Sequence, residues 1–297
     1  MNNIKSSFNM YDLENISGIK AHTIRIWEKR YELLEPKRLN RNVRLYDLDD
    51  LFKILNVALL YNRGIKISKI AKLSDEELLR TTKEFIDAKF KNDKAIVSLK
   101  LSMYNFDSVF FNQIYSEQIQ FKSFSEVFQD LFIPFLEFIG LQWQTNTLIP
   151  AHEHFISNLI YQKIQLNIEN LSWDNNTKSH ETYVLYLPEE EMHEIGILYL
   201  NYELLLRGKR TIYLGRCIPL SDLVTLQEQH DNLIWLSQFT VAPSVDFLNG
   251  YMNEVEKLLL ENNKFWAVSY RFGNQNYVTK NKNLKTFSSI KDVITKL

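Results

Sequence analysis

The chain has 297 residues, of which 45% are hydrophobic and 24% charged, the balance of a globular protein of two or three domains. The sequence has no apolar run of about eighteen residues and no apolar signal-peptide core, which predicts a cytoplasmic protein without a membrane-spanning helix. The single cysteine, Cys217, excludes a disulfide framework and a multi-cysteine metal site.

The charge is distributed unevenly along the chain. Residues 1–75 contain 14 Lys and Arg against 9 Asp and Glu, a net charge of +5, whereas the whole chain has a net charge of −1. An anionic partner is therefore expected for the N-terminal segment alone, although chance clustering would give the same count.

The spacing of apolar and turn residues in 10–31 is typical of a helix-turn-helix motif. A short amphipathic helix is broken at Gly18, which suits the left-handed backbone of a tight turn. A second helix begins at Ala21 and carries Ile24 and Trp27 on one face, as core residues require. A recognition helix presents the other positions of its early turns to the major groove, and here these are His22, Thr23, Arg25 and Ile26.

A basic segment follows the second helix. Pro36 ends the regular structure, and turn signals at Asn40 and Asn42 indicate a β-hairpin, or wing. Asp47 is expected to cap a further helix, which Gly64 closes. The basic residues of the wing are expected to clamp DNA phosphates, which add affinity without reading sequence; they are Lys37, Arg38, Arg41 and Arg44.

Three segments in order, TIRIWE at 23–28, RNVRLY at 41–46 and NRGIKISKI at 62–70, resemble the DNA-binding domain of the MerR family of bacterial transcription regulators. The resemblance covers residues 8–75 and defines a first domain at 1–75. It implies that bases are read by His22 and Thr23, and that the DNA backbone is contacted by Arg25, Arg41, Arg44 and Tyr46. A helix-turn-helix that binds protein instead of double-stranded DNA is the alternative.

Residues 76–172 show helical periodicity without a strand pattern. Four helices are expected, at about 76–92, 95–119, 123–143 and 151–170, with Pro134 as a candidate kink in the third. Antiparallel helices joined by short loops form a bundle, which is the second predicted domain.

One end of this bundle gathers Trp143, Glu153 and His154, which could line a ligand surface. The alternative is structural: Trp143 completes the core, and the other two are first-turn residues favoured by solvation and the helix dipole. His152 and His154 do not make a metal site, because residues two apart lie on different faces of a helix.

Residues 180–297 alternate between strand-like and helix-like stretches. The expected strands are 183–187, 210–214, 232–239, 264–270 and 284–287. This βαβ succession predicts a Rossmann-like parallel sheet with helices on both faces, whose ligands bind outside the carboxyl ends of the strands. Together the three segments predict a multidomain α and α/β protein: a winged helix-turn-helix, a helical bundle and the sheet domain.

The carboxyl end of the first strand is followed by Glu191-x-His193-x-x-Gly196, and not by a glycine-rich dinucleotide fingerprint. This motif resembles the E-x-H-x-x-G loop of cobalamin-binding domains. The resemblance implies that His193 is the lower ligand of the cobalt and that Glu191 polarises its imidazole. A solvated acidic loop is the alternative reading, because three more glutamates flank the histidine.

Trp143 and Glu153-His154 in a bundle before that motif, behind a MerR-type domain, resemble the cobalamin-dependent photoreceptor repressors of the CarH and LitR type. Residues that this resemblance assigns to the cofactor are Trp143, Glu153, His154, Glu191, His193, Gly196 and Ser237. A homo-oligomer is also expected, because a single recognition helix contacts too little DNA for useful specificity. Adenosylcobalamin is one form of the cofactor, and no catalysis is expected.

The chain also departs from that family. The Gly-Gly pair expected after the fourth strand is replaced by bulky residues at 270–272, and Gln144 stands where light-sensing members tend to have a histidine. These differences argue against a light-driven switch with two histidine ligands. Two rivals follow: a regulator whose altered cobalamin domain serves oligomerisation or a protein partner, and a corrinoid enzyme component with an appended DNA-binding domain.

Overall fold

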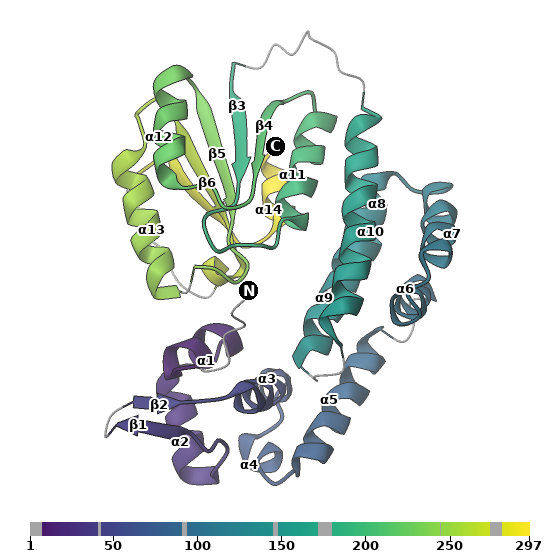
Figure 1. Cartoon of the computed structure of the whole chain (residues 1–297), viewed down its shortest axis with the longest axis vertical. Helices are drawn as coiled ribbons and strands as arrows, with labels where there is room; N and C mark the ends of the chain where they lie inside the picture. The colour runs from purple at the N-terminus through teal and green to yellow at the C-terminus, as the bar shows by residue number, and fades with distance from the viewer. Residues whose placement is uncertain are drawn as a thin grey trace. The chain divides into compact units, whose positions relative to one another are not determined.

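The structure is a computed structural model that describes residues 8–40, 43–90, 94–144, 148–171, 180–243, 245–273 and 281–297. The chain divides into two compact units, Met1–Leu159 and Ile160–Leu297 (Figure 1). Within the described residues, no helix is long and apolar enough to cross a membrane.

The first unit begins with the expected winged helix-turn-helix. Asn9 caps the first helix through a capping box, and Gly18 ends it with φ of +71°. Asp47 caps the helix after the wing in the same way. The elements are α1 (Met10–Ser17), α2 (Ala21–Tyr31), β1 (Lys37–Asn40), β2 (Val43–Leu45), α3 (Leu48–Asn62) and α4 (Ile67–Ile70).

A single hydrophobic core joins these elements. Ile24 and Trp27 of α2 pack into it with Leu13 of α1 and Ile54 of α3. Tyr46 is buried in the same core, and its backbone forms an isolated bridge with Phe8. The wing therefore folds onto the helices that it follows.

The remainder of the first unit is helical, as its periodicity indicates. Its elements are α5 (Asp75–Phe90), α6 (Lys94–Tyr104), α7 (Ser108–Ile119), α8 (Phe124–Val127), the π-helix η1 (Phe128–Phe132), α9 (Ile133–Gln144) and α10 (Pro150–Glu169), whose second half falls in the second unit. The single helix expected at 95–119 is wrong. The chain breaks there because Phe106 has φ of +51° and the side chain of Asp107 caps α7 by accepting from the N–H of Phe110.

The long third helix of the prediction contains the π-turn and then Pro134. The N–H of Ile133 donates to the carbonyl of Phe128, five residues earlier. This wider turn lies immediately before Pro134, which has no backbone N–H to donate. Pro134 is thus accommodated without ending the helix.

The second unit contains a five-stranded sheet in the order β4-β3-β5-β6-β7, with every pair parallel. Its strands are β3 (Thr182–Tyr186), β4 (Arg210–Gly215), β5 (Leu233–Gln238), β6 (Lys264–Val268) and β7 (Leu284–Phe287). The helical segments between and after them are α11 (Ile195–Leu206), α12 (Leu220–Gln229), α13 (Val245–Leu258), the 3₁₀ helix η2 (Tyr270–Gly273) and α14 (Ile290–Lys296).

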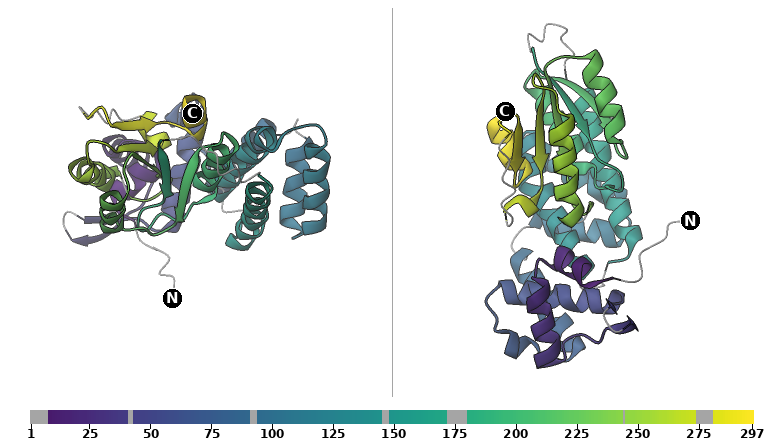
Figure 2. Two further views of the ribbon diagram at one scale, coloured as in Figure 1. Left: turned by 90° about the horizontal axis from the view of Figure 1, so that it is seen from above. Right: turned by 90° about the vertical axis from the view of Figure 1, so that its left-hand side faces the viewer.

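Helices cover both faces of this sheet, as predicted (Figure 2). Alternate residues of each strand enter opposite cores, so that Trp235 of β5 packs with α12 and α13, whereas Leu236 packs with α11 and α14. The strand order reverses at β3, which lies between β4 and β5. Ligands of such sheets bind at this reversal, outside the carboxyl ends of the strands.

Candidate functional site

The first turns of α2 carry the residues expected to read DNA. His22 and Arg25 are exposed, and Thr23 is half-buried with its hydroxyl oxygen 3.3 Å from Nε2 of His22. Ile26 is also exposed, whereas Ile24 and Trp27 anchor the helix in the core. The helix therefore presents a mixed polar and apolar surface.

The wing is tied to α2 by Glu28. One carboxylate oxygen of Glu28 accepts from Nε of Arg44 at 3.1 Å, and the other accepts from the hydroxyl of Tyr46 at 3.0 Å. Burial and the neighbouring carboxylate raise the pKa of Tyr46 well above its ordinary value. The phenol is thus neutral and donates to Glu28.

The position of Tyr46 does not fit the expected direct contact of its side chain with the DNA backbone. The side chain is only 1% exposed and its hydroxyl is bound to Glu28. Arg44 is half-buried and faces Arg38 across the hairpin. Arg38 lies on β1 with its side chain outside the described part, and Arg41 lies outside the described residues.

In the second unit, the loop between β3 and α11 turns Glu191 into the protein. The N–H of Glu191 donates to the carbonyl of Pro188 at 3.2 Å, and Glu190 adopts φ of +69°. Glu189 and Glu190 stay exposed, while Glu191 is wholly buried. The acidic loop is therefore solvated only in part.

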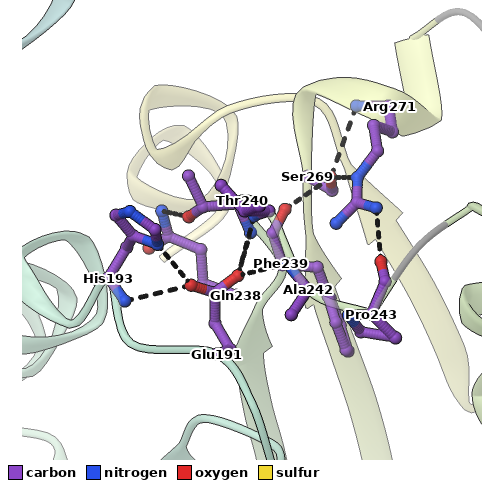
Figure 3. Close-up of polar contacts among 10 residues, drawn as sticks. Glu191, His193, Gln238, Phe239, Thr240, Ala242, Pro243, Ser269 and Arg271 are labelled. Atoms are coloured by element: carbon purple, nitrogen blue, oxygen red, sulfur yellow. Dashed lines mark hydrogen bonds and ion pairs between the residues drawn. The ribbon is translucent and has the colours of Figure 1, made fainter. Parts of the chain in front are cut away.

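The buried carboxylate of Glu191 is held by backbone amides from a neighbouring strand end (Figure 3). One oxygen accepts from the N–H groups of Thr240, Val241 and Ala242, which follow β5, at 2.8, 2.8 and 3.1 Å. Such convergent amides make an anion-binding nest. The contact bridges β3 and β5, where the strand order reverses.

The other oxygen of Glu191 holds His193. It lies 2.6 Å from Nδ1 of the imidazole and accepts the backbone N–H of the same residue at 3.0 Å. Burial acts to raise the pKa of Glu191, but the hydrogen bonds from His193 and from the N–H of Val241 outweigh it and lower the pKa to about 2. An ionised carboxylate accepts only, so Nδ1 of a neutral imidazole carries the proton.

The imidazole of His193 extends outward from this buried support, with 57% of the side chain exposed. A histidine that binds a metal commonly donates its second ring nitrogen to a carboxylate, which fixes the tautomer and raises the basicity of the first. If His193 binds a metal, this arrangement makes Nε2 the ligand atom. The Glu191–His193 pair therefore fits the cobalt-binding role that the E-x-H-x-x-G motif predicts for it.

Gly196 lies in the first turn of α11 beside the end of β5. A Cβ at this position would be 2.2 Å from Oε1 of Gln238. The absence of a side chain therefore admits the Gln238 amide, a neighbour that the sequence did not suggest.

Ser237 is wholly buried near the carboxyl end of β5, on the same face of the sheet as Trp235 and Phe239. The bulky residues in place of the expected glycines take two different positions. Tyr270 is exposed, whereas Arg271 is turned inward and only 7% exposed. Its Nη1 donates to the carbonyl of Pro243 at 2.6 Å (Figure 3).

The candidate residues of the bundle occupy helix ends. Trp143 lies in the last turn of α9, with its side chain outside the described part. Glu153 is in the first turn of α10, where its carboxylate accepts from Ser157 at 3.0 Å and lies 3.0 Å from Nδ1 of His154. The side chain of His154 is 71% exposed. No group of three metal-binding side chains occurs among the residues that the structure describes.

The chain matches two protein-family models in order. Residues 8–77 match the MerR HTH family regulatory protein, and residues 96–166 match the B12 binding domain. The chain is 26% identical over 214 residues to the HTH-type transcriptional repressor CarH of Myxococcus xanthus, covering 70% of each chain.

Among solved structures, the monomethylamine corrinoid protein of Methanosarcina barkeri is similar with a TM-score of 0.54. The match covers 67% of this chain and 94% of that one, and at 11% identity it shows the fold alone. These findings define the class: a DNA-binding regulator that carries a B12-binding domain. More narrowly, the chain is similar to MerR-family regulators over residues 8–77 and, over 70% of its length, to a CarH-type repressor.

The roles of Glu28, of the amides of residues 240–242 and of Arg271 were not predicted from the sequence. Glu28 is the last letter of TIRIWE, so a signal was present, but its two partners are 16 and 18 residues away. Backbone amides leave no trace in a sequence. Arg271 was noted only as a departure from glycine.

Proposed function

We propose that this chain represses transcription by binding a double-stranded DNA operator as a homo-oligomer, and that it senses cobalamin through His193. The main support for this proposal is the His193–Glu191 pair. An oxygen of the wholly buried Glu191 carboxylate lies 2.6 Å from Nδ1 of His193. The imidazole is thereby oriented with Nε2 as the ligand atom. Cobalamin, when bound, supplies a cobalt ion whose upper ligand is exchangeable and can therefore report on a signal.

The surface around His193 suits a large flat ligand with an apolar body. Four exposed hydrophobic side chains follow the carboxyl ends of three neighbouring strands, and they belong to Met192, Val241, Phe247 and Tyr270. A contiguous exposed apolar patch marks a binding surface, and we propose that these four side chains form one. Trp143, Glu153 and His154 are the residues of the helical bundle that would contact the cofactor, and adenosylcobalamin is one form that we propose the protein binds.

DNA binding is assigned to the exposed face of α2 and to the wing. His22 and Thr23 are proposed to face bases, and Arg25, Arg38, Arg41 and Arg44 to bind phosphates. One recognition helix contacts too little DNA for useful specificity, which favours a homo-oligomer on a repeated operator. The chain acts through binding and not as an enzyme.

A second candidate is a regulator whose sheet domain binds a protein partner in place of cobalamin. The inward position of Arg271 favours it, because this side chain fills space between the ends of β5 and β6 that a glycine would leave open. The apolar surface at Val241 and Tyr270 would then receive the partner.

One titration separates the two candidates. The purified protein is mixed with hydroxocobalamin, and the visible spectrum is compared among wild type, His193→Ala and His230→Ala, a control at an exposed histidine that ends α12. We expect wild type and His230→Ala to give the same histidine-ligated spectrum and His193→Ala to lose it while still binding DNA. No cobalamin bound to wild type, or an unchanged spectrum in His193→Ala, would refute cobalt ligation by His193.

A further inference from the structure

The loop after β5, residues 239–243, is anchored at both ends by residues that follow β6. The hydroxyl of Ser269 donates to the carbonyl of Phe239 at 2.7 Å, and Nη1 of Arg271 donates to the carbonyl of Pro243 at 2.6 Å. Arg271 also braces Ser269, because its Nε and its backbone N–H both lie 3.3 Å from the serine hydroxyl. The two anchors thus act as one unit.

Between the anchors lie the amides that bind Glu191. Three successive N–H groups, at residues 240–242, converge on one carboxylate oxygen (Figure 3). Successive amides point at a common centre only in particular backbone conformations, so the shape of this loop decides whether the nest exists. Holding Phe239 and Pro243 fixes that shape.

Burying the charged side chain of Arg271 at this position costs free energy. It is 7% exposed, and its Nη2 has no hydrogen-bond partner among the described residues. Burial lowers its pKa, although the Glu191 carboxylate acts in the opposite direction. A buried cation with incomplete pairing adds little to stability and is more readily understood as setting a geometry.

We propose that Arg271 is a positioning residue for His193. It fixes the 239–243 loop, the loop amides fix Glu191, and Glu191 fixes the tautomer and direction of the imidazole. Arg271 acts through the loop, because its hydrogen bonds go to Ser269 and Pro243. The identity of that ligand rests on the function proposed above, but the effect on His193 exists in the protein without cobalamin.

The test uses the full-length protein at a single pH and reads the ¹⁵N shifts of the His193 ring by NMR. Wild type is expected to show one tautomer, with the proton on Nδ1. Arg271→Met should give the averaged shifts of a solvent-exposed histidine, and Arg271→Lys, which can still donate to Pro243, should restore part of the wild-type signal. Hydroxocobalamin affinity should fall by about 10-fold or more in Arg271→Met, the usual effect of losing a supporting contact.

The matched control is Arg207→Met, which removes an arginine bound to the buried Glu203 in the same unit. It should lower stability without changing the His193 tautomer. If Arg271→Met fails to fold, the ¹⁵N shifts of the His193 ring are measured in Ser269→Ala instead, and they test the proposal in the same way. Unchanged ring shifts in the variant that folds, or an equal change in Arg207→Met, would overturn the proposal. Should wild type bind no cobalamin, the function above fails, and the tautomer measurement still decides this inference.

Discussion

Gly196 of α11 and Gln238 of β5 exclude a β-carbon between them, since a methyl group on the glycine would sit 2.2 Å from the glutamine Oε1. The backbone at Gly196 is otherwise helical, so the constraint is the neighbouring side chain and not the dihedral angles. The glutamine amide ends a long flexible side chain, which makes the constraint removable.

Gly196→Ala should therefore lower the free energy of unfolding by about 1 kcal/mol, the lower end of the cost of overpacking. In a Gln238→Ala background the same substitution should no longer lower it, because the clashing amide is gone and alanine favours helix. A double-mutant cycle by urea denaturation measures the coupling. Additive effects would show that the two side chains do not compete for space.

Glu28 supports the wing through the hydroxyl of Tyr46. Glu28→Ala leaves that buried phenol without its acceptor and should lower the free energy of unfolding by about 1–3 kcal/mol. Glu28→Gln keeps an acceptor oxygen and serves as the control, with a smaller loss expected. Chemical denaturation of both variants gives the comparison, and equal losses would mean that the phenol contact is not what Glu28 provides.

Arg44 is proposed to bind a phosphate of the DNA backbone. Arg44→Ala should weaken binding to all DNA sequences alike and reduce the slope of log affinity against log salt by about one. Arg80→Ala, at an exposed arginine of α5, is the matched control for the loss of one positive charge. Fluorescence anisotropy over a range of salt concentrations measures the slope. A slope unchanged in Arg44→Ala would remove the wing from the DNA contact.

The buried carboxylate of Glu191 predicts a loss of stability in acid. Its pKa in the folded protein, about 2, is below the ordinary value of 4.5, so its contribution is fully present above pH 4.5 and is lost as the pH falls toward 2. The contribution is roughly 3 kcal/mol at neutral pH. Glu191→Gln should flatten the dependence of unfolding free energy on pH in this window. Parallel curves for the two proteins without cobalamin would contradict the depressed pKa.

Sequence patterns predicted most of the fold because hydrophobic periodicity reports directly on burial. The five strands and the two-sided helical cover follow from it, and even the short strand Leu284–Phe287 is present. The break at Phe106–Asp107 was missed because a helix-compatible pattern continues on both sides. Its signals, a left-handed residue and a capping aspartate, are local and easily outweighed.

The site was predictable where side chains form a motif and hidden where the backbone acts. Glu191 and His193 lie two residues apart in the chain, so their pairing could be expected from the sequence. The amides that hold Glu191 come from another strand end, and no residue type encodes them. Arg271 could be noted as unusual, but its inward direction depends on Pro243 and Ser269, which only the fold brings near.

The π-turn before Pro134 absorbs one extra residue, so the rest of α9 keeps nearly the angular position that it would have without that residue. A turn closed by a bond to the fifth residue back holds one residue more than an α-helical turn, and each α-helical residue advances the direction of its side chain by about 100°. Removing one residue from Phe128–Phe132 would return the segment to α-helix and leave Trp143 at nearly the same angle about the helix axis. Removing one residue later in α9, where no wide turn holds an extra residue, would instead rotate Trp143 by about 100°.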